Sequence, residues 1–202
     1  MALARTTKLE AVNKALQMMG EAPINSLQGL FGLGNLAETT IDSVSRKLQT
    51  EGWSFNTDYG VSLVRDSSTN LISVGSNVSR IYVDPFDYPD IDVVQRGSKL
   101  YDRKNNTYEF ATNLTVDMTI ILDWDDLPEH ARVYIMTKTG RELQESMIGS
   151  KDLTEINLLV EQEVRAQFLE EETTLSDHNI LRGHSRRVNP IQTYRPSNVL
   201  NR

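Results

Sequence analysis

The spacing of apolar residues changes twice along this chain, and that change restricts the folds open to it. Near the start, Leu9, Val12, Leu16 and Met19 recur at the spacing of one helix face. From about residue 59 to residue 122, short runs of strand-forming residues alternate with Gly, Asn, Asp and Pro. Helical spacing then returns. The order α, α, β, α, α predicts an α+β protein with a β-rich segment inserted between helices.

Two helices are predicted before the β-rich segment. Thr6 and Thr7 offer a hydroxyl cap, with Glu10 nearby, for a first helix that ends at Gly20. The second helix runs from about residue 36 to residue 51. Each ends at a glycine, as helices commonly do.

The segment between these helices, residues 23–35, is rich in glycine and carries Leu30, Phe31 and Leu33. This composition predicts a loop with an apolar tip. Its glycines precede a helix without the lysine that a phosphate-binding loop requires, so nucleotide binding is not expected. We interpret the three apolar residues as a turn or as an exposed contact for another protein.

Two further helices are predicted after the β-rich segment. Asp126 is placed to cap the first of them, with Pro128 in its first turn and Glu129 near the positive end of the helix dipole. Arg132 is assigned to its solvated side, and the helix extends to about Ile148. The last helix spans residues 153–175. Five apolar residues are predicted on its buried face: Ile156, Leu159, Val160, Val164 and Phe168.

The β-rich segment contains seven strand-like pieces and a hairpin turn at residues 103–106. The pieces are residues 61–64, 71–74, 80–83, 92–94, 99–102, 107–110 and 114–122. We therefore predict an antiparallel helical bundle with an inserted β-rich domain and an extended C-terminal arm. The predicted parts are N-terminal helices (1–56), a β-rich insertion domain (57–125), C-terminal helices (126–176) and a basic arm (177–202).

Charge is distributed unevenly along the chain. The net charge is −7, yet residues 178–202 contain five arginines and no acid, which leaves −12 on the preceding residues. An acidic body argues against a protein that coats duplex DNA, because phosphate contacts need clustered Lys and Arg. The glutamates of the last helix are opposed only by Arg165 within that helix. They indicate either a solvated face with a disordered end or an arm that docks on another chain.

Several functional classes are not expected from this composition. The chain has no cysteine, which excludes disulfides, thiol catalysis and cysteine-ligated metals. No apolar run is long enough to cross a membrane, and residues 1–5 lead into no apolar signal core. The histidines, His130, His178 and His184, are not spaced for a metal site. We predict no metal and no cofactor.

One group of carboxylates supports two interpretations. Asp123, Asp125, Asp126 and Glu129 could supply the acid and base of glycoside hydrolysis. At a junction between strand and helix, the same residues serve as turn formers, cap and dipole partners. The second interpretation is favoured by the residue types alone.

Short motifs in collinear order over nearly the whole chain resemble one family. They are Met19–Pro23, Ser26–Gly29, Glu51–Asn56, Asn70–Ile72, Leu100–Arg103, and Asp126–Glu129 followed by Arg132, Tyr134, Ile135, Thr137, Lys138 and Arg141. These segments resemble the tail tubular protein A family, the adaptor or gatekeeper ring of T7-like podophages. The strongest block is the Pro-Glu helix start at Pro128 and Glu129 with the basic, aromatic helix after it.

The resemblance implies a virion structural protein, made in the host cytoplasm, that is not an enzyme. It implies a twelve-fold ring between the portal and the tail nozzle, tail tubular protein B, with DNA passing through the channel without sequence-specific binding. On that basis Leu30, Phe31 and Leu33 are candidates for contact with the nozzle or a neighbouring subunit. The candidates for contact with the portal lie in the arm: Arg182, Arg186, Arg187, Tyr194 and Arg195.

Two alternatives remain at this point. The carboxylates at residues 123–129 leave open a tail-associated glycan hydrolase, which would release reducing sugar from polysaccharide. A cytosolic helical regulator would instead be a stable monomer, and the collinear motifs disfavour it.

Overall fold

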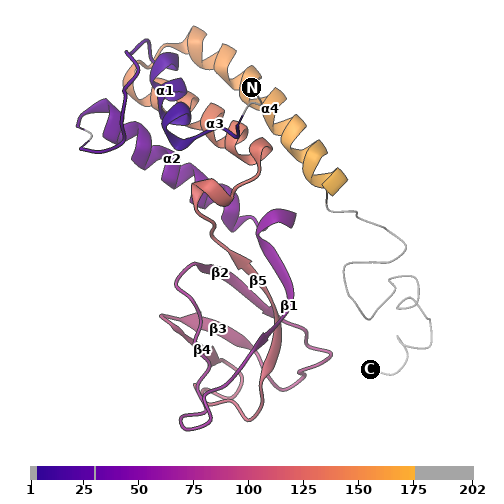
Figure 1. The fold of residues 1–202 in the computed structure, drawn as a ribbon. Helices are drawn as coiled ribbons and strands as arrows, with labels where there is room; N and C mark the ends of the chain where they lie inside the picture. Colours follow the sequence, from indigo (N-terminus) through magenta and orange to yellow (C-terminus); the bar gives the residue numbers. More distant parts are fainter. Residues whose placement is uncertain (1–3, 30, 176–202) are drawn as a thin grey trace, which may run out of the picture.

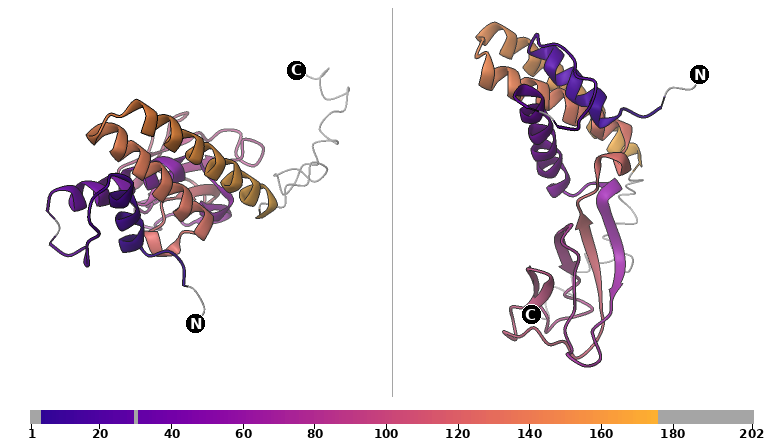
Figure 2. Two further views of the ribbon diagram at one scale, coloured as in Figure 1. Left: turned by 90° about the horizontal axis from the view of Figure 1, so that it is seen from above. Right: turned by 60° about the vertical axis from the view of Figure 1, so that its left-hand side comes forward.

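Four helices gather in one lobe and five strands in another, in the part of the chain that the structure describes. A computed structural model describes residues 4–29 and 31–175 (Figure 1). The helices are α1 (Lys8–Met18), α2 (Leu33–Thr50), α3 (Glu129–Met147) and α4 (Lys151–Leu175). The strands of the β lobe lie below the helices, reached from the end of α2 and left toward α3 (Figures 1 and 2). The α+β class predicted from apolar spacing is confirmed.

The start of α1 is the predicted capping box. The hydroxyl of Thr7 accepts the backbone N–H of Glu10 at 3.2 Å, and the Glu10 carboxylate accepts the backbone N–H of Thr7 at 2.7 Å. Helix α2 begins at Leu33, earlier than the predicted residue 36, so the end of the predicted loop is helical. Gly32 occupies its N-cap with φ of 62°, a conformation that glycine adopts readily.

The predicted cap of α3 is wrong. Asp126 lies in the short 3-10 helix η2 (Trp124–Asp126), and Pro128 holds the N-cap without a side-chain hydrogen bond. Arg132, predicted on the solvated side, is only 3% exposed. Its guanidinium donates to three backbone carbonyl groups, those of Thr6 at 2.7 Å, Asp125 at 2.6 Å and Leu127 at 2.9 Å. The buried guanidinium therefore joins the segment that leads into α3 to the segment that leads into α1.

Helix α3 lies at the centre of the helical lobe and contacts α1, α2 and α4. The buried residues of this lobe form one hydrophobic cluster that includes Leu16, Ile41, Ile135 and Leu143. A Cβ at Gly140 would collide with the sulfur of Met18 on α1. The glycine thus leaves room for the end of the Met18 side chain where α1 packs against α3.

Helix α4 does not bury the face predicted for it. Val164 packs against the helical core and Phe168 is buried within it, but Ile156, Leu159 and Val160 are 58%, 66% and 42% exposed. The cause lies in polar partners on α3. Two polar pairs join α4 to that helix: Arg141 with Glu161, and Asn157 with Gln144. These pairs draw the polar side of α4 inward and leave its apolar side outside.

The β lobe contains two antiparallel sheets. Strands β1 (Thr57–Leu63), β5 (Leu114–Ile120) and β2 (Val78–Val83) form the larger one, in the order β1-β5-β2. Strands β3 (Val93–Arg96) and β4 (Lys99–Asp102) form a hairpin. A second hydrophobic cluster fills this lobe: Ile72, Val74, Val83, Val93, Leu100, Phe110, Leu114 and Val116.

Two of the predicted strands are not strands. Residues 71–74 and 107–110 make only isolated bridges, one of which pairs Leu71 with Glu109. Ile72 and Phe110 of these segments are nonetheless buried. Their apolar residues therefore reflect packing into the second cluster rather than strand pairing. The turn predicted at residues 103–106 is present, with Asp102 and Thr107 hydrogen bonded across it at 2.8 and 3.2 Å.

Two buried amides connect the lobes where the chain leaves the helices and where it returns. The Nδ2 of Asn56 donates to the carbonyls of Gln49 and Ile120, both at 2.8 Å. Its Oδ1 accepts the N–H of Trp53, also at 2.8 Å. The Gln49 side chain both accepts the N–H of Leu122 at 2.7 Å and donates to its carbonyl at 3.1 Å. The outgoing and returning segments are thereby fastened to each other and to α2.

Replacing Asn56 by Ala should lower the free energy of unfolding by about 3 kcal/mol, because three backbone groups lose their partner in a buried place. Urea denaturation followed by circular dichroism measures this. Asn35→Ala, at an exposed position of α2, is the matched control and should change stability by less than about 0.5 kcal/mol. Equal effects at the two positions would show that the Asn56 bridge contributes little.

Candidate interaction surfaces

The predicted apolar loop projects one side chain. Phe31 is 90% exposed, whereas Leu33, the first residue of α2, is partly buried against the helical cluster. Leu30 lies outside the described residues. The structure thus separates two residues that the sequence analysis grouped together.

The base of this loop is fixed although its tip is exposed. The Asn13 side chain on α1 donates to the carbonyl of Ile24 at 3.0 Å and accepts its N–H at 2.7 Å. Ile24 and Leu27 pack against the helical cluster. Phe31 is therefore presented by a loop anchored to α1.

The arm residues predicted to contact the portal, Arg182, Arg186, Arg187, Tyr194 and Arg195, lie outside the described residues. The described chain ends at Leu175, the last residue of α4. The last turns of α4 therefore determine where the arm starts.

These last turns are held by a polar cluster at His130, called here the His130 cluster: His130, Ser54, Glu171 and Glu172. The Nε2 of His130 lies 2.7 Å from Glu172 Oε1, and its Nδ1 lies 3.1 Å from Glu171 Oε2. The other oxygen of Glu172 accepts the backbone N–H of Ser54 at 3.0 Å and its hydroxyl at 2.8 Å. The cluster ties α4 to α3 and to the segment that leads into β1.

Arg165 forms a second tie about two turns earlier in α4. Its guanidinium carbon lies 5.0 to 5.5 Å from the ring centroids of Tyr134, Trp53 and Phe168, and its Nη2 donates to Glu51 at 2.8 Å. A cation among aromatic faces is stabilised by their negative potential. Within α4, only Arg165 could be predicted from the sequence as a partner of the acids. His130 and Arg141 could not, because both lie on another helix.

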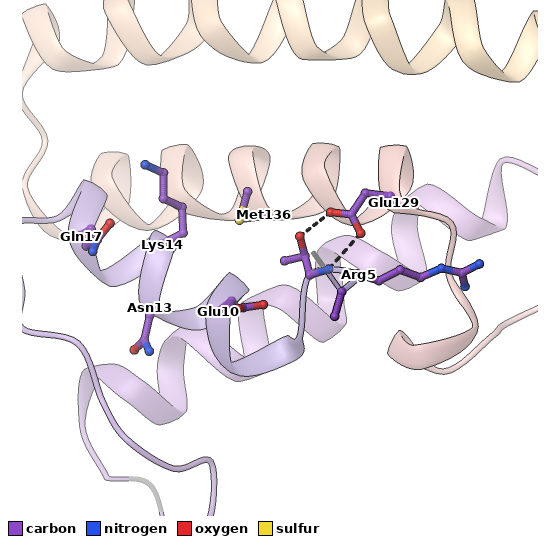
Figure 3. Close-up of a pocket in the computed structure, with 9 residues that line it drawn as sticks. Arg5, Glu10, Asn13, Lys14, Gln17, Glu129 and Met136 are labelled. Atoms are coloured by element: carbon purple, nitrogen blue, oxygen red, sulfur yellow. Dashed lines mark hydrogen bonds between the residues drawn. The ribbon is translucent and has the colours of Figure 1, made fainter. Parts of the chain in front are cut away.

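The carboxylates of the hydrolase hypothesis are used for hydrogen bonding or are exposed. A groove of about 770 Å³ runs between α1 and α3, with Glu10 and Glu129 among its lining residues (Figure 3). Glu129 accepts both the backbone N–H of Thr6, at 2.9 Å, and its hydroxyl. Hydrogen bonds from the backbone and hydroxyl of Thr7 hold the pKa of Glu10 below its ordinary value. Glu10 was not among the carboxylates of that hypothesis, and a lowered pKa suits it to remain ionised rather than to act as a glycosidase acid.

The remaining carboxylates of that hypothesis, Asp123, Asp125 and Asp126, are exposed around η2. Among the residues described, no group of three or more His, Asp or Glu side chains could hold a metal ion. No described helix is long and apolar enough to span a membrane.

A comparison with family models places this architecture. A model described as tail tubular protein matches residues 9–178. The chain belongs to the tail tubular protein family. The match runs from α1 through both lobes to just beyond α4, and it confirms the resemblance seen in the motifs. A search of curated proteins found no match. This tail tubular protein is therefore a structural component of a phage tail.

Replacing Glu172 by Gln should destabilise this tail tubular protein by about 2 kcal/mol, because the amide has one acceptor oxygen where the carboxylate has two, and it removes the negative charge that faces Ser54 and His130. Hydrogen exchange of the amides at residues 168–175 should accelerate with the loss. Glu170→Gln, at an exposed position of the same helix, removes the same charge and serves as control. Similar exchange in both variants would contradict a clamp at Glu172.

Proposed function

We propose that this tail tubular protein assembles as a ring of about twelve subunits that joins the portal to the tail nozzle and extends the channel for DNA. The observation that carries this proposal is the exposed apolar surface of α4. Its first half and the preceding end of α3 expose seven large apolar residues: Met147, Ile148, Leu153, Ile156, Leu158, Leu159 and Val160. Contiguous apolar patches on a soluble protein mark interaction sites.

The charge of the body supports a passage for DNA. Residues 1–177 carry −12. A channel wall with negative charge repels phosphates, so DNA passes without being held by the attraction that binding proteins use. Sequence-specific contacts have no role in such a passage.

The arm is the part proposed to bind the portal. Its five arginines and Tyr194 supply cationic and aromatic contacts, the types enriched in protein interfaces. It follows α4 directly, and the His130 cluster fixes the end of that helix. A fixed starting point reduces the entropy that the arm loses on binding.

The β lobe is the part proposed to meet the nozzle, together with neighbouring subunits. It has a hydrophobic cluster of its own and exposes Tyr82 and Phe86 at 53% and 79%. Aromatic side chains exposed on a lobe that is already packed are available for a partner.

Deleting residues 178–202 should abolish binding to the portal ring and leave the circular dichroism of the remaining protein unchanged. Light scattering of the protein, alone and mixed with the portal, gives the mass of each complex. A variant with Arg182, Arg186, Arg187 and Arg195 replaced by Gln keeps the length of the arm and isolates its charge. Undiminished binding by the deleted protein would assign the portal contact elsewhere.

Ring assembly should strengthen as salt rises from very low values to moderate ones, because a ring places like charges side by side and salt screens them over about 8–10 Å. Light scattering at a series of salt concentrations follows the mass. Assembly that weakens steadily from the lowest salt would contradict this, and would indicate contacts dominated by opposite charges.

A further inference from the structure

A second hollow lies between α3 and α4, called here the α3/α4 groove. Its volume is about 260 Å³. Its lining is mainly apolar or aromatic: Tyr134, Leu158, Glu161, Gln162, Arg165, Ala166 and Leu169. Leu158 and Leu169 are 43% and 41% exposed at its sides. A concave, mostly apolar site with few polar groups is typical of a place where a partner inserts an anchor side chain.

The chemistry of this groove suits an aromatic side chain. The guanidinium of Arg165 lies among the groove residue Tyr134 and two other rings. Its Nη1 is buried without a hydrogen-bond partner among the described residues. A further ring would pack against leucine walls and present its negative face or a nearby backbone carbonyl toward that cation.

The same chain exposes one side chain of this kind on an uncharged loop. Residues 22–37 contain no charged residue, although 24% of the chain is charged. Phe31 is the most exposed of its large hydrophobic residues within the described ranges, at 90%. Two copies of an acidic body repel each other, and an uncharged loop is the part that can approach without that repulsion.

We propose that Phe31 of one subunit occupies the α3/α4 groove of the next subunit. The proposal rests on the ring proposed above and names its contact. The loop tip and the groove are different surfaces of one molecule, so the contact is head-to-tail, and repetition of such a contact closes a ring when the rotation allows it. The groove offers the cation, and the loop offers the ring and no competing charge.

The absence of cysteine makes a direct test possible in the full-length chain. Gln28→Cys places a thiol on the exposed loop and retains Phe31, and Gln162→Cys places one at the groove. A short bis-maleimide should link the double variant into a ladder of covalent oligomers beyond the dimer. The matched control, Gln28→Cys with Gln167→Cys, moves the second thiol to an exposed position of α4 that does not line the groove. Each single variant is limited to dimers.

Phe31→Ser in the Gln28→Cys, Gln162→Cys background should reduce the ladder at least tenfold. Light scattering of the same samples reports whether rings form. Rings with a ladder in the Gln162 pair and none in the Gln167 pair support the contact. Rings without that ladder, or with a ladder unaffected by Phe31→Ser, overturn the contact and leave the ring in place. A protein that stays monomeric at every salt concentration and with the portal overturns both.

Discussion

The double connection between the lobes is the constraint on which the rest of this tail tubular protein depends. The chain leaves the helical lobe after α2 and returns before α3, and each lobe has its own hydrophobic cluster. Gln49 and Asn56 fasten the two crossing segments by hydrogen bonds to backbone groups, and both side chains are buried. Buried amides with satisfied partners fix geometry in a way that apolar contacts do not. The orientation of the β lobe therefore follows from α2.

The first half of α4 packs polar side chains against α3 and exposes apolar ones. Such packing indicates that the sequence does not serve the stability of the single subunit alone. The helix places Glu161 beside Arg141, with side chains 12% and 16% exposed, and leaves Ile156 and Leu159 exposed. Replacing an ion pair that is largely removed from water by apolar residues is often neutral or stabilising, so the pair is a poor choice for stability alone. It is a reasonable choice if the apolar side is needed for a partner. The way α4 packs in one subunit thus bears on the assembly of many subunits.

Local signals predicted much of this fold, and partners distant in sequence account for what they missed. The Thr7 capping box and the change in apolar spacing are local, and both predictions are confirmed. Arg132 was misplaced because its partner Thr6 lies far away along the chain. The buried face of α4 was misplaced because its outcome depends on Arg141 and Gln144 of α3. The His130 cluster left no local signal, since it unites three separate segments.

The surfaces available for contacts are mostly found on one of the two lobes. Its arm, exposed α4 face and apolar loop all belong to the helical lobe or extend from it, whereas the β lobe packs around a cluster of its own. A contact between subunits needs rigid support, which α3 supplies because it contacts the other three helices. The His130 cluster adds a tie from the end of α4 to the segment before β1, beside the tie formed by Arg165. The end of α4 is therefore joined through Glu172 and Ser54 to the segment that leads into the β lobe, in addition to the packing of each hydrophobic cluster.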